Sequence, residues 1–265
     1  MIKYLFWGLL WSMPVAAATL SDPLPQGELV YGRLEPGERI YHRGFELKPD
    51  ASGTFVFGVG RKQTEPLTFV VKKGLFSSEE ITRSVQPRTW ASEQIDGVPP
   101  RTIAPSAEDK KRIAREQKIL DAAREKEEQT AVPRCFLWPV KGRISGTFGK
   151  QRIYNGVMKG DHSGFDIAAP TGTPVKAVAD GRVQLAQDDL FYTGGTVLIE
   201  HGSGVFSGYS HLSEVSVPVG TFVQAGDVIG AVGATGRATG PHLHLTISWR
   251  SVRVDPQILL TDRCP

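Results

Sequence analysis

Histidine is the residue type whose placement says most about chemistry in this chain. The sequence holds six histidines, and four of them fall, with one aspartate, into three separated motifs: His162-Ser-Gly-Phe-Asp166, Ser210-His211-Leu212 and Pro241-His242-Leu243-His244. Two imidazoles and one carboxylate form a ligand set that suits Zn²⁺. A fourth coordination position left to water would make such a site catalytic rather than structural, which indicates metal-assisted hydrolysis.

The spacing within each motif favours a shared cleft. Residues i and i+2 of a strand point to the same face, so His242 and His244 would face one cleft while Leu243 turns away. His162 and Asp166 are four residues apart, and this spacing on a strand also places both side chains on one face. His201 precedes the hairpin signal Gly202-Ser-Gly204 and is assigned to turn structure instead.

These motifs resemble the lysostaphin/LytM family of zinc metallopeptidases. The resemblance covers Trp138 to Pro256 and rests on seven segments: Phe148-Gly149, His162-Ser-Gly-Phe-Asp166, Gly172-Thr-Pro-Val175, Ala179-Asp-Gly-Arg-Val183, Tyr209-Ser-His-Leu212, Gly233-Ala-Thr-Gly236 and Thr239-Gly-Pro-His-Leu-His244. It implies that His162, Asp166 and His244 bind Zn²⁺. It also implies that His211 and His242 assist catalysis, as proton acceptor or as donor to the oxyanion, and the sequence does not divide these roles between them.

The activity implied by the resemblance is that of an exported zinc metalloendopeptidase, which hydrolyses peptide cross-links of peptidoglycan with zinc-activated water. In a Gram-negative cell the bond would be D-alanyl–meso-diaminopimelate. Two alternatives stay open: a non-catalytic module that binds the wall or activates amidases, and an endopeptidase that acts on glycine-rich proteins. Tyr154 and Asn155, upstream of His162, are candidate oxyanion donors, and loop packing is the other interpretation of both.

The elements that must position the histidines are strands. Glycine or proline separates the candidate strands after Cys135, which are Val175–Val178, Arg182–Ala186, Thr196–Glu200, Phe206–Ser210, Thr221–Val223, Val228–Val232 and His242–Ser248. No long amphipathic helix interrupts them. Residues 133–265 are therefore predicted to form an antiparallel β domain, and the resemblance makes it a zinc metallopeptidase domain of the lysostaphin type.

A second β domain and a charged helix are predicted upstream. Within residues 19–104, short runs separated by turn signals predict an Ig-like β-sandwich: Glu28–Leu34, Arg39–Arg43, Thr54–Val59 and Leu67–Lys72. Ser106 and Asp109 form a capping box, which predicts a helix over residues 107–129 within a linker of residues 105–132. The helix either lies in solvent or is an arm that docks on a partner or shields the cleft. A further hypothesis is that the N-terminal domain or this helix covers the cleft until a regulatory protein partner moves it.

The first residues indicate export. Lys3 precedes a short apolar run, and Ala16-Ala-Ala18 is a small-residue cleavage pattern, so residues 1–18 are predicted to be a signal peptide. The run is too short to span a bilayer comfortably, and no stable membrane span is expected after cleavage. The predicted location is periplasmic or secreted.

Charge and cysteine content add two further expectations. The net charge is +3, and the basic residues are scattered and follow no nucleic-acid motif, so binding of nucleic acid is disfavoured. The two cysteines, Cys135 and Cys264, flank the histidine-bearing segment. In an oxidising compartment they are expected to pair as a disulfide, with two free buried thiols as the alternative.

Overall fold

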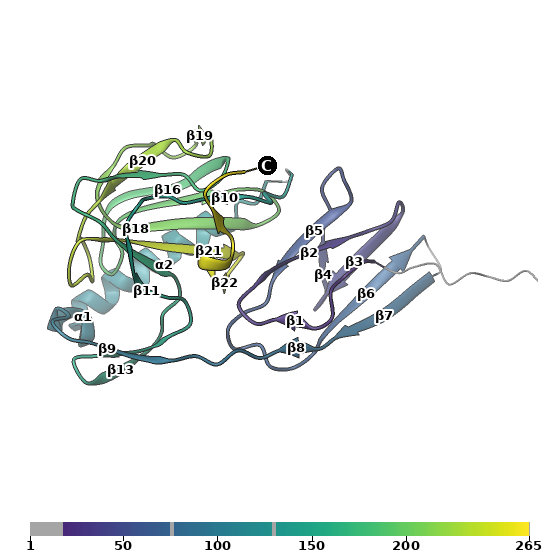
Figure 1. Ribbon diagram of the computed structural model, residues 1–265, viewed down its shortest axis with the longest axis horizontal. Helices are drawn as coiled ribbons and strands as arrows, with labels where there is room; N and C mark the ends of the chain where they lie inside the picture. The colour runs from purple at the N-terminus through teal and green to yellow at the C-terminus, as the bar shows by residue number, and fades with distance from the viewer. Residues whose placement is uncertain (1–17, 75–76, 129–130, 265) are drawn as a thin grey trace, which may run out of the picture.

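The computed structural model describes residues 18–74, 77–128 and 131–264, which form two β-rich units joined by a segment that carries two helices (Figure 1). The protein is mainly β, as predicted. The predicted signal peptide lies, apart from Ala18, outside the described residues. Within the described part of the chain, no helix is long and apolar enough to cross a membrane.

The first unit is built from strands with short turns between them. Its strands are β1 (Leu24–Pro25), β2 (Leu29–Arg33), β3 (Glu38–His42), β4 (Phe45–Leu47), β5 (Thr54–Gly58), β6 (Leu67–Lys73), β7 (Ser77–Arg83) and β8 (Val85–Gln86). An antiparallel sheet has the order β4-β3-β6-β7, β2 pairs with β5, and β1 pairs with β8 in parallel. The four predicted runs coincide with β2, β3, β5 and β6.

The core of this unit explains its strand pattern. Alternate residues of β3 and β6 are buried, and Ile40 and Phe69 pack against Phe55 and Phe57 of β5. This alternation is typical of sheets with one face on the core and one in solvent. The assignment to the immunoglobulin type, like the domain boundaries, stays a prediction.

The connecting segment contains β9 (Ser92–Ile95), α1 (Pro100–Ile103) and α2 (Ala107–Arg124). The capping box is present at α2, because Ser106 and Asp109 each accept from the other's backbone N–H. The helix was predicted to reach residue 129, and this was wrong, since it ends at Arg124. The residues that follow are held by the peptidase unit: Glu127 pairs with Arg250, and Glu128 with Arg182.

The second unit is dominated by one ten-stranded antiparallel sheet. Its main path is β11 (Arg143–Gly146), β14 (Phe165–Ala168), β21 (His242–Trp249), β18 (Val205–Val215), β17 (Gly194–Glu200), β16 (Gly181–Leu190) and β19 (Phe222–Val223). Off this path lie β15 (Pro174–Lys176), β20 (Val228–Val232) and β22 (Val252–Val254). The antiparallel β prediction for this half is confirmed.

Smaller elements surround that sheet. The hairpin of β12 (Gln151–Tyr154) and β13 (Val157–Asp161) pairs through β12 with β9, although β9 precedes the predicted linker. Near the ends of the unit, β10 (Phe136–Leu137) pairs with β23 (Leu260–Thr261), and a short 3₁₀ helix covers Pro256–Ile258. The connecting segment is therefore part of the structure around the large sheet.

The two faces of the large sheet have different roles. On β21, Leu243, Leu245 and Ile247 are fully buried in the main apolar core. His242 and His244 alternate with them and point to the other face, as the i, i+2 spacing predicts. Leu120 and Ala123 of α2 pack on that second face, against Leu198 and other apolar residues of β16–β18.

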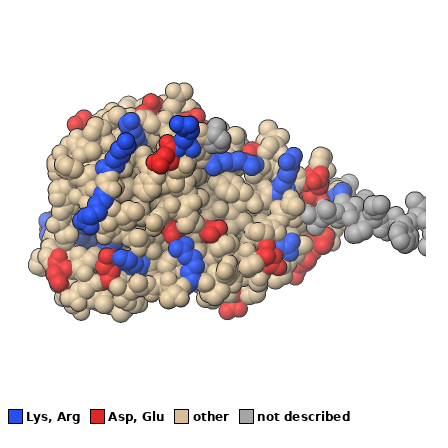
Figure 2. Space-filling model, viewed as in Figure 1, with Lys and Arg blue, Asp and Glu red and all other residues tan. Residues whose placement is uncertain are grey.

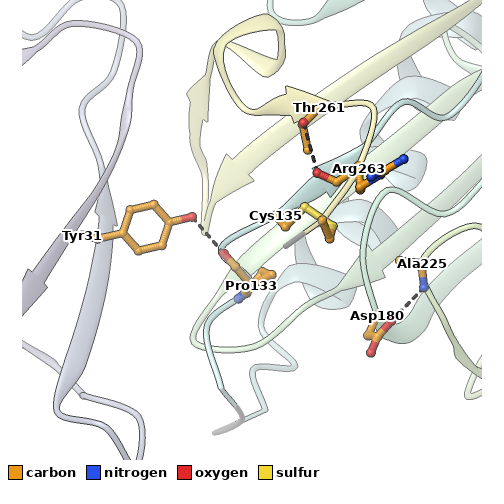
Figure 3. The surroundings of a disulfide bond; sticks show 8 residues. Tyr31, Pro133, Cys135, Asp180, Ala225, Thr261 and Arg263 are labelled. Carbon is orange, nitrogen blue, oxygen red and sulfur yellow. Dashed lines mark hydrogen bonds between the residues drawn. A yellow bond between two sulfur atoms is a disulfide. The ribbon is translucent and has the colours of Figure 1, made fainter.

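A disulfide closes the second unit, and a polar contact beside it joins the two units (Figure 3). Cys135 and Cys264 are bonded, with 5.6 Å between their Cα atoms, which confirms the expected pairing. Close to it, the Tyr31 hydroxyl donates to the Pro133 carbonyl at 2.9 Å, across from the first unit to the second. Basic and acidic side chains are interspersed on the face of the molecule seen in Figure 2.

Candidate metal centre and catalytic cleft

Three neighbouring strands bring the predicted site residues together. Asp166 on β14 lies opposite His244 on β21, and Ser210 on β18 lies opposite the same histidine from the other side. His211 follows Ser210 with a φ of 65°, in the left-handed region, within an irregular stretch of β18. Such irregularities re-aim a side chain, and here the ring of His211 lies beside those of His242 and His244.

His162, Asp166 and His244 form a compact donor set. Asp166 Oδ1 lies 3.1 Å from His162 Nε2 and 2.7 Å from His244 Nδ1, and the two nitrogens are 3.1 Å apart. Donor atoms at about 2.1 Å from a tetrahedral ion would lie roughly 3.4 Å apart, so the three atoms are spaced much like the ligands of one zinc ion. Both His162 and Asp166 are buried.

The protonation of the imidazoles is set by backbone carbonyls. The Nδ1 atoms of His162, His211 and His242 each lie 2.8 Å from a carbonyl oxygen, those of Thr147, Thr235 and Gly240 respectively. A carbonyl can only accept, so in the neutral form of each ring Nδ1 carries the proton and Nε2 keeps a lone pair. Such second partners fix the tautomer of histidines that bind metals or move protons.

Electrostatics agree with a cation site. Burial alone raises the pKa of Asp166, but its contacts with the His162 and His244 rings outweigh burial and hold that pKa well below its ordinary value. The rings lower this pKa only when a proton on them points at Asp166. When the His162 ring is neutral and protonated at Nδ1, its Nε2 lone pair instead faces the ionised carboxylate at 3.1 Å. Like-charged electron pairs at this distance repel unless a proton or a cation lies between them. The chemistry of the donor set therefore fits a divalent metal ion.

His211 and His242 flank this donor set without joining it. Their ring centroids are 4.8 Å apart, and His242 Nε2 is 4.0 Å from Asp166 Oδ1. Burial, together with the neighbouring His244 and His242, lowers the pKa of His211 to about 3. His211 is consequently neutral at pH 7, with Nε2 able to accept a proton.

Arg152 is a site residue that sequence reasoning missed. It is buried on β12, and its Nη2 donates to Asp166 Oδ2 at 2.9 Å, on the side away from the histidines. Its Nε lies 3.3 Å from a carboxylate oxygen of Glu93 on β9. Gly146 leaves room for this pair, since a Cβ there would lie 2.6 Å from Arg152 Nη2. No motif in the sequence marks Arg152 as a partner of Asp166.

The donor set opens into a cleft of about 530 Å³. Besides the five predicted residues, Tyr154, Tyr192 and Arg237 line it, and the Arg237 guanidinium lies over both tyrosine rings. Glu93, Ile95 and Val98 of the connecting segment form part of one wall. Asn155 does not line the cleft; its side chain is bonded to the backbone of Val98, so for this residue packing is what the structure shows.

His201 lies outside the cleft, as expected. It directly follows β17, is buried, and bonds through Nδ1 to the Asp180 carbonyl and through Nε2 to the Ser207 hydroxyl. Burial lowers its pKa to about 4, which keeps the ring neutral. Its role is structural, in the hairpin between β17 and β18.

Comparison with known proteins gives one family. Residues 160–256 match the sequence profile of Peptidase family M23. A crystal structure described as a putative peptidase M23 from Pseudomonas aeruginosa is 32% identical, with a TM-score of 0.71 over 92% of this chain and 97% of that one. That similarity extends beyond the matched segment and includes both β units.

Each of three curated relatives matches less than half of this chain. DD-carboxypeptidase/endopeptidase Mpg of Neisseria meningitidis is 47% identical over 36% of this chain and 22% of its own length. Peptidoglycan DD-endopeptidase ShyA of Vibrio cholerae is 42% identical over 39% of this chain and 24% of its own length. Cell division protein DipM of Caulobacter vibrioides is 35% identical over 47% of this chain and 21% of its own length. The chain thus spans less than a quarter of the length of these three relatives.

Proposed function

The chain belongs to peptidase family M23, and from this premise we propose that it is an exported zinc metalloendopeptidase which hydrolyses the peptide cross-links of peptidoglycan. Membership makes it a hydrolase that acts on peptide bonds. ShyA, named as a peptidoglycan DD-endopeptidase, supports the substrate class, and the DD-specificity in the names of ShyA and Mpg supports D-alanyl–meso-diaminopimelate as the bond. The Cys135–Cys264 disulfide supports a periplasmic or secreted location, since disulfides persist in oxidising compartments.

The observation that carries the proposal is the convergence of His162 Nε2, Asp166 Oδ1 and His244 Nδ1 within 4.8 Å of one another. These three residues would hold the ion. A bound zinc ion would supply Lewis acidity, which polarises the scissile carbonyl and makes water nucleophilic at neutral pH. An intact donor set also argues against a purely non-catalytic wall-binding or amidase-activating role.

The proton transfers fall to His211 and His242. In the neutral tautomer of each ring the Nδ1 proton points at a backbone carbonyl, so Nε2 of either ring is the atom that can take the proton of the attacking water. The imidazolium that results can donate a hydrogen bond to the tetrahedral oxyanion or return the proton to the leaving amine. Arg152 holds the second oxygen of Asp166, which fixes the carboxylate while these steps occur.

The test separates metal binding from proton transfer. For the mature chain on purified sacculi, His244→Ala is expected to remove both bound zinc and muropeptide release. His211→Ala and His242→Ala are expected to keep the metal and to lower release by about 10²–10⁴-fold, the usual contribution of a general base. His42→Ala, on β3 of the first unit, is the matched control and should change neither quantity. Release by His244→Ala without bound metal would refute the proposal.

A further inference from the structure

A second cavity, of about 210 Å³, lies between α2 and the large sheet. Its floor continues the face that carries the histidines: Thr246 follows His244 at i+2, and Gly208 and Ser210 come from the adjacent β18. In Figure 1, α2 runs behind the sheet strands and forms the opposite wall. Four residues line both this cavity and the catalytic cleft, namely Ser163, Tyr192, Thr193 and His244. The two spaces therefore adjoin.

Two arginines, Arg124 from the last turn of α2 and Arg253 from β22, line this cavity. Among the described residues, Arg253 donates a single long bond, 3.4 Å, to the Thr246 hydroxyl, and Arg124 donates to the Leu120 carbonyl at 3.3 Å. The buried Nε of Arg124 has no partner among the described residues. In the described part of the chain, neither guanidinium has a carboxylate oxygen within 4.0 Å.

Many other arginines of this protein do pair with carboxylates. Eight of them pair with carboxylates, several in exposed positions: Arg39, Arg61, Arg88, Arg101, Arg112, Arg152, Arg182 and Arg250. The one carboxylate that lines the cavity, Glu116, is held by Arg112 and by the backbone N–H of Phe191. It does not neutralise the two arginines.

The two positive charges are also under electrostatic strain. Burial lowers the pKa of Arg253 to about 9, and the neighbouring Arg124 lowers it further in the same direction. Burial also lowers the pKa of Arg124, and the nearby carboxylate of Asp121 offsets part of that effect. Both guanidinium groups nevertheless stay charged at pH 7. Buried charges with no carboxylate in direct contact are costly, so the cavity is a place where an anion would be stabilised.

The shape of the donors selects the kind of anion. A guanidinium group presents a planar fork of N–H donors that matches a carboxylate in two parallel hydrogen bonds. The floor adds the hydroxyl-bearing residues Thr196, Ser210 and Thr246, which can donate to further lone pairs. Peptidoglycan stem peptides carry free carboxylates, and the catalytic cleft next to the cavity is where the proposed function puts such a peptide.

We propose that the cavity beneath α2 is a substrate subsite, in which Arg124 and Arg253 bind a free carboxylate of the peptide while its scissile bond lies in the catalytic cleft. The inference deepens the proposed function, because that function supplies the substrate class. It assigns α2 a part in substrate recognition, although this helix lies outside residues 160–256 matched by the family profile.

Binding can be tested without turnover. Isothermal titration of the zinc-loaded mature chain would use a stem tetrapeptide as the free acid, as its C-terminal amide and as the amide of its diamino-acid side chain. We expect the free acid to bind about tenfold more tightly than one of the two amides. This difference corresponds to one charge-assisted guanidinium–carboxylate pair. Equal affinity for all three peptides would overturn the proposal.

Variants assign the preference to the cavity. In Arg124→Gln and Arg253→Gln the affinities for the free acid and for the amide should differ by no more than about twofold. Each variant removes a guanidinium partner of the carboxylate, which the amide peptide does not have, so only the affinity for the free acid falls. Arg115→Gln, on the exposed side of the same helix, is the matched control and should keep the wild-type ratio. A preference that survives in both cavity variants would place the carboxylate elsewhere and refute the proposal.

Folding and hydrolysis are measured separately. Since the two guanidinium groups repel each other in the free protein, each single Gln variant should melt no lower than wild type in the absence of peptide. If one variant does not fold, the other carries the test alone. A chain that keeps the arginine-dependent acid preference but does not cleave sacculi would refute the proposed hydrolysis and leave the subsite standing.

Discussion

At the scale of single residues, Asp166 connects the parts of the site. Its Oδ1 faces the nitrogens of His162 and His244, and its Oδ2 accepts from Arg152. One carboxylate thus joins the donor set to a buried cation that cannot itself bind a metal. Because Arg152 also contacts Glu93 on β9, the orientation of a proposed metal ligand depends on a strand that the family profile does not include.

Replacing Arg152 tests this dependence. Arg152→Gln should lower zinc affinity by about 10–100-fold, because residues that orient a metal ligand usually contribute that much. The measurement is a competition titration with a chromophoric chelator. Arg143→Gln, also on the cleft wall but with no hydrogen bond to Asp166 among the described residues, should leave the affinity unchanged. Equal affinities for wild type and Arg152→Gln would show that Asp166 is held in place by its backbone alone.

The site residues that belong to a sequence motif could be predicted from the sequence. His242-x-His244 on a strand and the His162, Asp166 pair indicated shared faces, and the structure does bring these residues together. Arg152 was not predictable, because its contact with Asp166 joins β12 and β14, which belong to different sheets. The same is true of Arg124 and Arg253, which belong to distant segments and show no common pattern in the sequence.

At the scale of elements, the β17–β18 hairpin holds a buried carboxylate next to the structural His201. Glu200 is 1% exposed and accepts the backbone N–H of Gly204 through Oε1 at 3.2 Å. Burial raises its pKa to about 7, and the neighbouring Glu128 adds to that rise. A carboxyl with a raised folded-state pKa lowers stability as pH rises from its unfolded value near 4.5 through about 7.

Glu200→Gln should remove this loss. The free energy of unfolding of the variant, relative to wild type, is expected to be about 2 kcal/mol more favourable at pH 8 than at pH 5. Urea denaturation at the two pH values measures it, with the exposed Glu65→Gln as the control for loss of a carboxylate. Stability differences that are the same at both pH values would contradict a raised pKa.

Some helix and strand boundaries could be predicted from the sequence and others could not. Strands bounded by glycine and proline, and the start of α2 at its capping box, were predictable from local chemistry. The end of α2 was not, because tertiary ion pairs of Glu127 and Glu128 draw the chain toward the sheet. The sequence of residues 92–95 shows no alternation of apolar and polar residues that would predict a strand. These residues form one because they pair with the edge of β12.

At the scale of the whole molecule, the two β units are joined at several points. Arg88 pairs with Asp255 at 2.9 Å, and the backbone N–H of Asp255 donates to the Gly27 carbonyl at 2.7 Å. Leu29 and Val56 of the first unit pack into the core of the second. These contacts, with the Tyr31–Pro133 bond, give the first unit a supporting role around the peptidase unit. Whether a regulatory protein partner acts through it stays a prediction.

The disulfide should contribute strongly to global stability. It joins residues 129 apart, and closing a loop of that length removes about 4–5 kcal/mol of unfolded-state entropy. The double variant Cys135→Ser, Cys264→Ser should therefore lose about that much in non-reducing urea denaturation. Reductant should shift wild type toward the variant and leave the variant unchanged. A variant as stable as oxidised wild type would show that the bond contributes nothing.

The central claim concerns one ion and three donors. Anomalous diffraction from crystals of the mature chain, collected on both sides of the zinc absorption edge, tests it most directly. The account predicts a single strong zinc peak within bonding distance of His162 Nε2, Asp166 Oδ1 and His244 Nδ1, with His211 and His242 outside that distance. The absence of a peak there in zinc-supplemented crystals, or an ion held by other residues, would contradict it.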